Sequence, residues 1–169
     1  LFNHEGTRRG LDFVTRKITN GIAKIRHCIE KENAFQPLSL GNLEAQRDWS
    51  DAEDFMEGVW LMLNQNTPKE YVLASGEMHT IRNFLEEALF CAEIEFTKIG
   101  EKENEKYISP YTGKSLVEIN PKFYRPAEVH SLCGDPSLAE KELGWKRKTN
   151  FRGLVKKMYT NDYQLLSQS

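Results

Sequence analysis

Helical and strand-like patterns alternate along this chain, and the alternation decides its fold class. Apolar residues recur every three or four positions in several stretches, a spacing that places them on one face of a helix. Between these stretches lie short apolar or alternating runs bounded by Gly, Pro, Ser and Asn, which predict strands. Helices that alternate with short strands are typical of an α/β fold rather than of a helical bundle or a β-sandwich.

The expected elements can be bounded from the residues at their ends. Ser50 or Asp51 is a suitable N-cap for the second helix, and Asn150 for the last one. Gly144 is expected to end the short fourth helix. Residues 100–113 are charged and rich in turn formers, so we expect a surface loop there. The predicted helices are 11–26, 52–64, 80–93, 136–143 and 151–166, and the predicted strands are 1–3, 37–41, 71–74, 95–99 and 115–120.

Composition and charge exclude several classes of function. The chain has 169 residues, of which 39% are hydrophobic and 28% charged, a balance typical of one soluble domain. Its net charge is −2, with acids and bases interspersed, so neither nucleic acid nor an anionic membrane is an expected partner. No apolar run approaches the roughly 20 residues of a membrane span. The 3 cysteines and 4 histidines are scattered, which predicts no disulfide framework and no metal site, and favours the cytoplasm.

Several other residues receive ordinary structural interpretations. Trp60 and Trp145 are expected in the hydrophobic core. Asp54, in the second helix, is expected to be an exposed acid. Asp48 is interpreted as a cap for the turn that follows it, and Trp49 as a core residue.

The segment FYRPAEV, residues 123–129, carries the most informative pair of side chains. Pro126 fixes its own backbone φ and pushes Arg125 into an extended conformation, which leaves that guanidinium little backbone freedom. The planar donors of a guanidinium suit a phosphate, and the Glu128 carboxylate can accept from two hydroxyl or N–H groups. A nucleotide-sugar offers both kinds of group. The alternative interpretation is a surface salt bridge beside a turn.

Further motifs follow one another along almost the whole chain. They are LFNHE at 1–5, FVTRKI at 13–18, SLGNL at 39–43, RDW at 47–49, GEMH at 76–79 and YRPAEV at 124–129. Read in this order, they closely resemble the C-terminal half of the GDP-mannose 4,6-dehydratase family. That family belongs to the extended short-chain dehydrogenases/reductases.

The resemblance implies a fold and a domain organisation. Residues 1–169 would form one domain, the C-terminal nucleotide-sugar-binding part of a Rossmann-type α/β fold. Residues 1–28 and about 68–94 would complete the Rossmann sheet and its helices. Leu1 resembles the end of a buried strand and no Met precedes it, so we expect a fragment whose cofactor-binding half lies upstream.

The resemblance also implies roles for individual residues. NADP would be bound by His4 and Arg9. The family has Ser-Pro where this chain has Gly6-Thr7, which loosens the loop that carries Arg9. The substrate GDP-mannose would be bound by Asn3, Val14, Lys17, Arg47, Arg125 and Glu128.

Alternatives exist for some of these residues. Asn3 could be a loop residue that bonds its own backbone, and Lys17 could be a solvated helix charge. By resemblance, Asn3 instead reaches the substrate diphosphate and Lys17 borders the guanine. Arg47 and Arg125 would supply two guanidinium groups for one diphosphate.

The activity implied by the resemblance belongs to a longer protein. The family converts GDP-D-mannose to GDP-4-keto-6-deoxy-D-mannose by NADP-linked oxidation, water elimination and reduction. This chain contains no glycine-rich GxGxxG loop and no Tyr-x-x-x-Lys pair, so we expect no catalytic residue in it. The full-length parent would be a cytoplasmic lyase, a dimer or tetramer. This chain would supply its recognition of the GDP-sugar and would be inactive in isolation.

Two other functions remain open from the sequence. One is another nucleotide-sugar 4,6-dehydratase or epimerase, whose substrate carries a different nucleobase. The other is a non-catalytic nucleotide-sugar-binding domain. The sequence upstream of Leu1 would discriminate between an enzyme and a binding domain.

Overall fold

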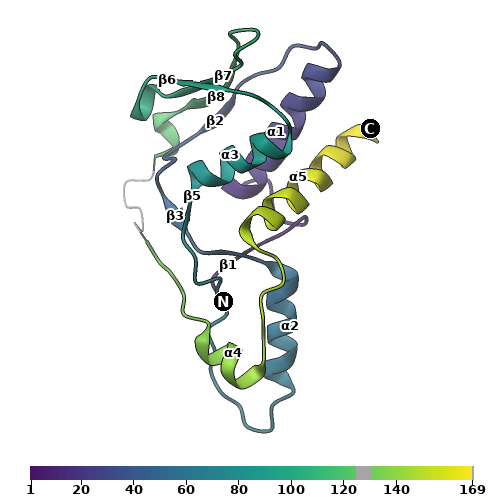
Figure 1. Cartoon of the computed structure of the whole chain (residues 1–169), viewed down its shortest axis with the longest axis vertical. Coiled ribbons are helices and arrows are strands. Elements are labelled where there is room, and N and C mark those ends of the chain that lie inside the picture. The colour runs from purple at the N-terminus through teal and green to yellow at the C-terminus, as the bar shows by residue number, and fades with distance from the viewer. Residues whose placement is uncertain (125–130, 169) are drawn as a thin grey trace.

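The computed structural model describes residues 1–124 and 131–168 and confirms an α/β fold (Figure 1). The upper part of the view contains long helices and a four-stranded sheet, and we call it the three-helix body. The lower part contains α2 (Ala52–Leu63) and α4 (Ser137–Leu143), and we call it the α2–α4 end. Strand β1 (Asn3–Glu5) lies between the two.

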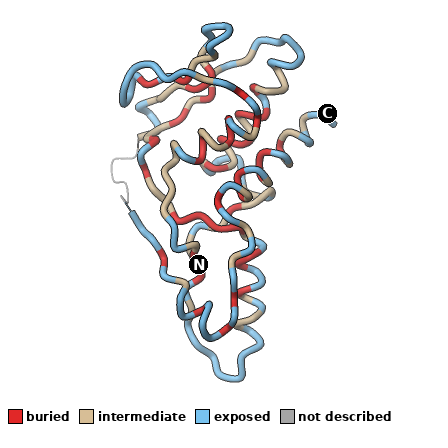
Figure 2. Tube along the Cα trace, in the orientation of Figure 1, coloured by how far each residue is buried: buried red, intermediate tan, exposed pale blue. Residues whose placement is uncertain are grey.

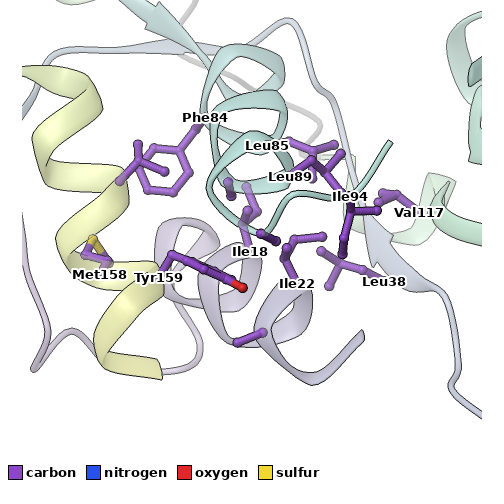
Figure 3. Close-up of a cluster of buried hydrophobic side chains, with 14 of the residues drawn as sticks. Ile18, Ile22, Leu38, Phe84, Leu85, Leu89, Ile94, Val117, Met158 and Tyr159 are labelled. Carbon is purple, nitrogen blue, oxygen red and sulfur yellow. The ribbon is translucent and has the colours of Figure 1, made fainter. Parts of the chain in front are cut away.

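The helices of the three-helix body pack their apolar faces together. They are α1 (Val14–Glu30), α3 (Ile81–Cys91) and α5 (Phe151–Ser167). Figure 3 shows apolar side chains from all of them pointing toward one another. The labelled helix residues are Ile18, Ile22, Phe84, Leu85, Leu89, Met158 and Tyr159. Within each helix these residues share one face, so the apolar periodicity of the sequence accounts for this core.

A small mixed sheet covers another side of the same core. Its strands are β2 (Leu38–Leu40), β6 (Thr97–Ile99), β7 (Lys106–Ile108) and β8 (Ser115–Ile119), with the 3₁₀ turns η1 (Lys102–Asn104) and η2 (Pro121–Phe123) nearby. The order is β2-β8-β7-β6, with β2 parallel to β8 and the remaining pairs antiparallel. Leu38 and Val117 carry the core from the helices to the sheet (Figure 3).

The α2–α4 end has a separate and smaller core. Asp51 caps α2 by accepting a hydrogen bond from the backbone N–H of Glu53 at 3.0 Å. The buried apolar residues here are Phe55, Leu73, Ala139, Leu143 and Trp145. Much of this end is coloured as exposed in Figure 2, whereas buried segments run through the helices of the body.

Short strand pairings join the two regions. Strand β1 pairs in parallel with β4 (Trp49–Asp51). Strand β3 (Gln46–Arg47) pairs antiparallel with β5 (His79–Thr80). These pairings place the first loop of the chain beside the segment that carries the RDW motif.

The first helix differs from its predicted bounds. It begins at Val14 instead of residue 11 and continues to Glu30 instead of residue 26. A turn closed by a bond from Phe13 N–H to the carbonyl of Gly10 precedes it, and Phe13 is the extended N-cap. The loop after β1 is therefore longer than the apolar periodicity indicated.

Three other segments were predicted wrongly. The first strand covers Asn3–Glu5 instead of residues 1–3, and Leu1 is 57% exposed. Residues 71–74 do not form a strand, although the N–H of Phe2 donates to the carbonyl of Leu73 at 2.9 Å. The expected surface loop 100–113 contains strand β7, whose Tyr107 is fully buried. Tyr107 is the only buried residue of this three-residue strand, which is too short an alternation to indicate a strand.

The burial expectations were confirmed for Trp145 and Trp49 and wrong for Trp60 and Asp54. Trp60 is 63% exposed because it lies on the outer face of α2. Asp54 is buried, and its carboxylate accepts backbone N–H bonds from Lys148 and Thr149. The apolar residues of α2 surround much of the helix, so their pattern does not indicate which face is buried.

Two kinds of feature are absent from the described residues. Within 1–124 and 131–168, no helix has both the length and the apolar character needed to cross a membrane. In the same residues, no group of three or more His, Cys, Asp or Glu side chains could hold a metal ion.

Candidate functional site

A cleft of about 470 Å³ lies where β1, the start of α1 and the β2–β4 segment meet. Most of the predicted site residues line it. These are Asn3, Arg9, Val14, Lys17 and Arg47. Residues far apart in the sequence thus share one space, as the motif order implied.

The predicted residues Asn3 and His4 lie on opposite faces of strand β1. Side chains alternate between the two faces of a strand. Asn3 and Glu5 line the cleft, whereas His4 lies against the smaller core, with its ring centroid 5.7 Å from that of Phe55. The Nδ1–H of His4 donates to the carbonyl of Phe2 at 2.9 Å, which leaves the lone pair of a neutral ring on Nε2. His4 therefore does not share the cleft with Arg9.

Arg9 is held on the cleft wall by an acid and a ring. Its Nε lies 3.2 Å from Oε2 of Glu5, and its guanidinium lies 3.5 Å from the ring centroid of Phe13. The hydroxyl of Thr15 donates to the same Glu5 oxygen at 2.6 Å. Burial raises the pKa of Glu5, while Thr15 and Arg9 oppose that rise. A carboxylate in this place orients the guanidinium and reduces the net positive charge around it.

Lys17 is more enclosed than a solvated helix charge. Its Nζ lies 3.8 Å from the ring centroid of Phe123, which belongs to η2. Burial lowers the pKa of this amine. An ammonium group on an aromatic face beside a cleft can bind an anion or a polar ring edge.

Arg47 reaches the cleft because its neighbours are fixed. Trp49 is buried in the core of the body. The buried Asp48 accepts backbone N–H bonds from Ser75, Gly76 and Gly134 at 2.7–3.1 Å. The expectation that Asp48 caps the next turn was wrong, because it binds a turn much later in the chain.

Gly41 is a site residue that the sequence did not reveal. A Cβ at this position would lie 2.6 Å from the carbonyl oxygen of Phe123. The backbones of the SLGNL segment and of η2 can approach this closely only because Gly41 has no side chain. Gly41 lines the cleft, and Phe123 places an aromatic ring there beside Lys17. The available signals were its place at the end of the predicted strand 37–41 and within the SLGNL motif.

Glu5 is a second residue missed from the sequence. It stands two positions after Asn3, so alternation along β1 places both on the cleft side. Arg125 and Glu128, by contrast, lie outside the described residues.

The electrostatics of the cleft suit a phosphorylated ligand. The described cations that line it are Arg9, Lys17 and Arg47, and the described acids are Glu5 and Asp12. Three cations and two acids thus line the described part of the cleft, which leaves its lining with a small excess of positive charge. Aromatic surface from Phe123 adjoins these cations and could contact a planar base.

Comparison with known proteins identifies sequence relatives of this chain. A family described as GDP-mannose 4,6 dehydratase matches residues 1–158. GDP-mannose 4,6 dehydratase from Drosophila melanogaster is 43% identical over 100% of this chain and 42% of its own length. The enzyme of that name from Dictyostelium discoideum is 45% identical over 98% of this chain and 45% of its own length. The chain therefore spans less than half of the length of these relatives.

Solved structures share the fold at low sequence identity. RMD from Pseudomonas aeruginosa, complexed with NADPH, aligns with a TM-score of 0.74 at 19% identity over 96% of this chain and 46% of that one. UDP-glucose 4-epimerase from Thermus thermophilus, complexed with NAD, aligns with a TM-score of 0.68 at 18% identity over 95% and 44%. These likenesses establish the fold, which is of the Rossmann type.

Proposed function

Because this chain belongs to the GDP-mannose 4,6-dehydratase family, we propose that the full-length protein converts GDP-D-mannose to GDP-4-keto-6-deoxy-D-mannose. The described part supplies recognition of the GDP-sugar. The observation that carries this proposal is the cleft beside β1, which gathers Lys17, Arg47 and Asn3 from distant motifs.

The diphosphate is assigned to the side of the cleft formed by Arg47 and Asn3. A guanidinium donates to phosphate oxygens in a planar fork, and an amide adds another donor. We assign Arg125 as the second guanidinium and Glu128 as an acceptor for hydroxyl groups, on the strength of the YRPAEV motif. Two guanidinium groups balance the approximately two negative charges of a nucleoside diphosphate.

The guanine is assigned to the side formed by Val14, Lys17 and Phe123. Guanine presents O6 and N7 as neighbouring acceptors, and a lysine ammonium is a suitable donor to them. Phe123 already holds Lys17 in place through its ring. The apolar side chain of Val14 can pack against a flat base.

NADP is assigned to Arg9 and His4. The side chain of Arg9 is 26% exposed at the cleft, and its ion pair with Glu5 is made through Nε. A guanidinium with donors to spare fits a phosphate of NADP, so the residues present fit the cofactor. NADP would supply the hydride acceptor for the oxidation and the donor for the reduction. Arg9 would bind and orient it, and His4 would approach it from the other face of β1.

We further propose that residues 1–28 and about 68–94 complete a Rossmann sheet and its helices. The parallel pairing of β1 with β4 and the Phe2–Leu73 bond are consistent with this assignment. A homo-oligomer in the cytoplasm is proposed by resemblance to the family.

A nucleotide-sugar epimerase is the second candidate. Solved UDP-glucose 4-epimerases share the fold, with TM-scores of 0.68 and 0.70. Their identity to this chain is 18% and 15%, whereas the curated dehydratases reach 43% and 45%. This contrast favours GDP-mannose as the substrate.

Turnover by the full-length protein tests the activity. With GDP-mannose and NADP we expect a 4-keto-6-deoxy product that NMR or mass spectrometry detects, and no product from UDP-glucose. Preferential conversion of a UDP-sugar would refute the assignment.

Binding of GDP tests the site. Arg47→Ala should weaken GDP binding roughly tenfold to a hundredfold, because a charge-assisted bond contributes about 1.5–3 kcal/mol. Calorimetry is the measurement, and Arg152→Ala is the control, because Arg152 is exposed at the start of α5 and outside the cleft. Unchanged affinity in the Arg47 variant would remove Arg47 from the site.

A further inference from the structure

An ion pair joins α1 and α5 across the interior of the three-helix body. Arg16 of α1 has a side chain that is 12% exposed, and Asp162 of α5 is fully buried. The Nε of Arg16 lies 2.7 and 2.9 Å from the two carboxylate oxygens, and its Nη2 lies 2.7 Å from Oδ1. The hydroxyl of Thr19 donates to Oδ2 at 2.6 Å. Asp162 is thus fully engaged, and it fixes the guanidinium plane of Arg16.

The same guanidinium holds the loop that follows β1. Its Nη1 donates to the carbonyl of Thr7 at 2.6 Å and to the carbonyl of Arg9 at 2.9 Å. Gly6 and Gly10 flank this segment, and glycine leaves the backbone permissive at both ends. Both carbonyls accept from the same nitrogen, Nη1, so the position of Arg16 determines the position of the backbone that carries Arg9.

The pair is poorly explained as a source of stability alone. Desolvation of two charges offsets most of their attraction, and well-packed apolar residues are often as stable in the same place. An apolar pair could join α1 to α5 equally well. It could not donate to the carbonyls of the loop.

We propose that Arg16 and Asp162 are positioning residues that hold the loop 6–10, so that the C-terminal helix sets the placement of Arg9 for cofactor binding. This inference rests on the proposed function only in its last step, the assignment of Arg9 to NADP. Figure 1 shows α5 alongside α1, which is the arrangement that lets Asp162 of α5 hold Arg16 of α1. Arg16 and Asp162 touch neither substrate nor cofactor in this scheme.

Loop order can be measured without any ligand. Trypsin cleaves after Arg8 and Arg9, which lie in the loop itself, and mass spectrometry identifies these cuts. In the full-length protein, Asp162→Asn and Arg16→Lys should speed cleavage at these bonds about tenfold, because the loop opens more often. The matched control is Arg26→Lys, since Arg26 pairs with Glu30 on the surface of the same helix.

Cofactor binding supplies the second measurement. We expect both variants to weaken NADPH binding roughly tenfold and to change GDP binding less than about twofold, because Lys17 and Arg47 stay in place. Arg9→Ala tests the cofactor assignment by itself. If Arg9→Ala binds NADPH normally, the proposed cofactor role fails, and the cleavage rates still decide whether Arg16 and Asp162 hold the loop.

An apolar replacement separates positioning from stability. The triple variant Arg16→Met, Thr19→Val, Asp162→Leu removes the charges and the hydroxyl together, so it should fold even where a single variant does not. We expect a melting temperature near that of the wild type with fast loop cleavage and weak NADPH binding. Wild-type cleavage and NADPH affinity in the folded triple variant would overturn the proposal.

Discussion

The three-helix body and the α2–α4 end are stabilised by different interactions. The body buries apolar side chains from α1, α3, α5 and its sheet in one continuous core (Figure 3). The α2–α4 end has a small apolar core, and it leaves Met56, Trp60 and Leu63 exposed along α2. Apolar burial therefore contributes much less to the second region than to the first.

Buried carboxylates add hydrogen bonds in and beside the α2–α4 end, where apolar burial is small. Asp54 accepts from the N–H groups of Lys148 and Thr149, which lie between α4 and α5. Asp48 accepts from Ser75, Gly76 and Gly134. These bonds are directional, so they determine loop positions that apolar contacts would leave variable. Loop positions in and beside the α2–α4 end therefore depend on a few buried acids, whereas the apolar core of the body depends on volume and packing.

The largest expected effect is the loss of an aromatic ring from the body. Phe84→Ala should lower the free energy of unfolding by about 3–5 kcal/mol, because Phe84 is fully buried and its ring contacts Trp49 and Phe151 edge-on. Urea unfolding is the measurement. Phe90→Ala is the control, since Phe90 lies on the same helix and is 77% exposed. Equal losses in the two variants would contradict the claim that burial in its apolar core stabilises the body.

Much of the secondary structure of the two regions could be predicted from the sequence. Apolar periodicity placed α2, α3 and α5 within a few residues, because burial of one helix face leaves a regular trace. Strand β7 was not predicted because it has three residues and only Tyr107 among them is buried, which gives no recognisable alternation. Asp54 was misjudged because its partners, such as Lys148, are distant in the sequence, and no local pattern reveals long-range backbone bonds.

The next effect concerns the acid that joins α2 to the segment after α4. Asp54→Ala should lower the free energy of unfolding by about 1–3 kcal/mol, because the N–H groups of Lys148 and Thr149 lose their acceptor. Asp54→Asn keeps an oxygen in place and should lose less. Calorimetric melting distinguishes the two variants. An alanine variant as stable as the wild type would show that solvent replaces the carboxylate.

The candidate site shows the same limit of sequence reasoning. Asn3, Lys17 and Arg47 were predicted from motifs, and the structure brings them into one cleft. Gly41 was not predicted, because its importance comes from the close approach of Phe123, a contact between distant segments. Residues whose side chains can bind a ligand are recognisable in the sequence by their type and motif. A glycine that permits a close contact between distant segments is not.

A smaller effect is expected from acid titration of the body. Arg82 lowers the pKa of Glu105 by hydrogen bonding, with both guanidinium Nη atoms bonded to the carboxylate. A lowered folded-state pKa gives stability that is present above the unfolded value of 4.5 and is lost as the pH falls through the folded value. We expect a loss of about 1 kcal/mol from this pair as the pH falls from the unfolded value through the folded one.

The variant Glu105→Gln tests this pH dependence. It should make the unfolding free energy less sensitive to pH in the same range, because one titrating group is removed. The exposed acid Glu118, whose pKa is also lowered, by Lys106, is the control, and Glu118→Gln should have a smaller effect. An unchanged slope in the Glu105 variant would assign the acid sensitivity elsewhere.

The smallest effect is expected on the outer face of α2. Trp60→Gln should change the free energy of unfolding by no more than about 0.5 kcal/mol, because the indole is 63% exposed and glutamine supports a helix at least as well. Its control is Phe55→Leu on the inner face, where the fully buried ring contacts Trp145 and a loss of about 1 kcal/mol or more is expected. Both are measured by urea unfolding. A loss above about 2 kcal/mol for Trp60→Gln would mean that this face is covered in solution, and the α2–α4 end would then depend on apolar burial as the body does.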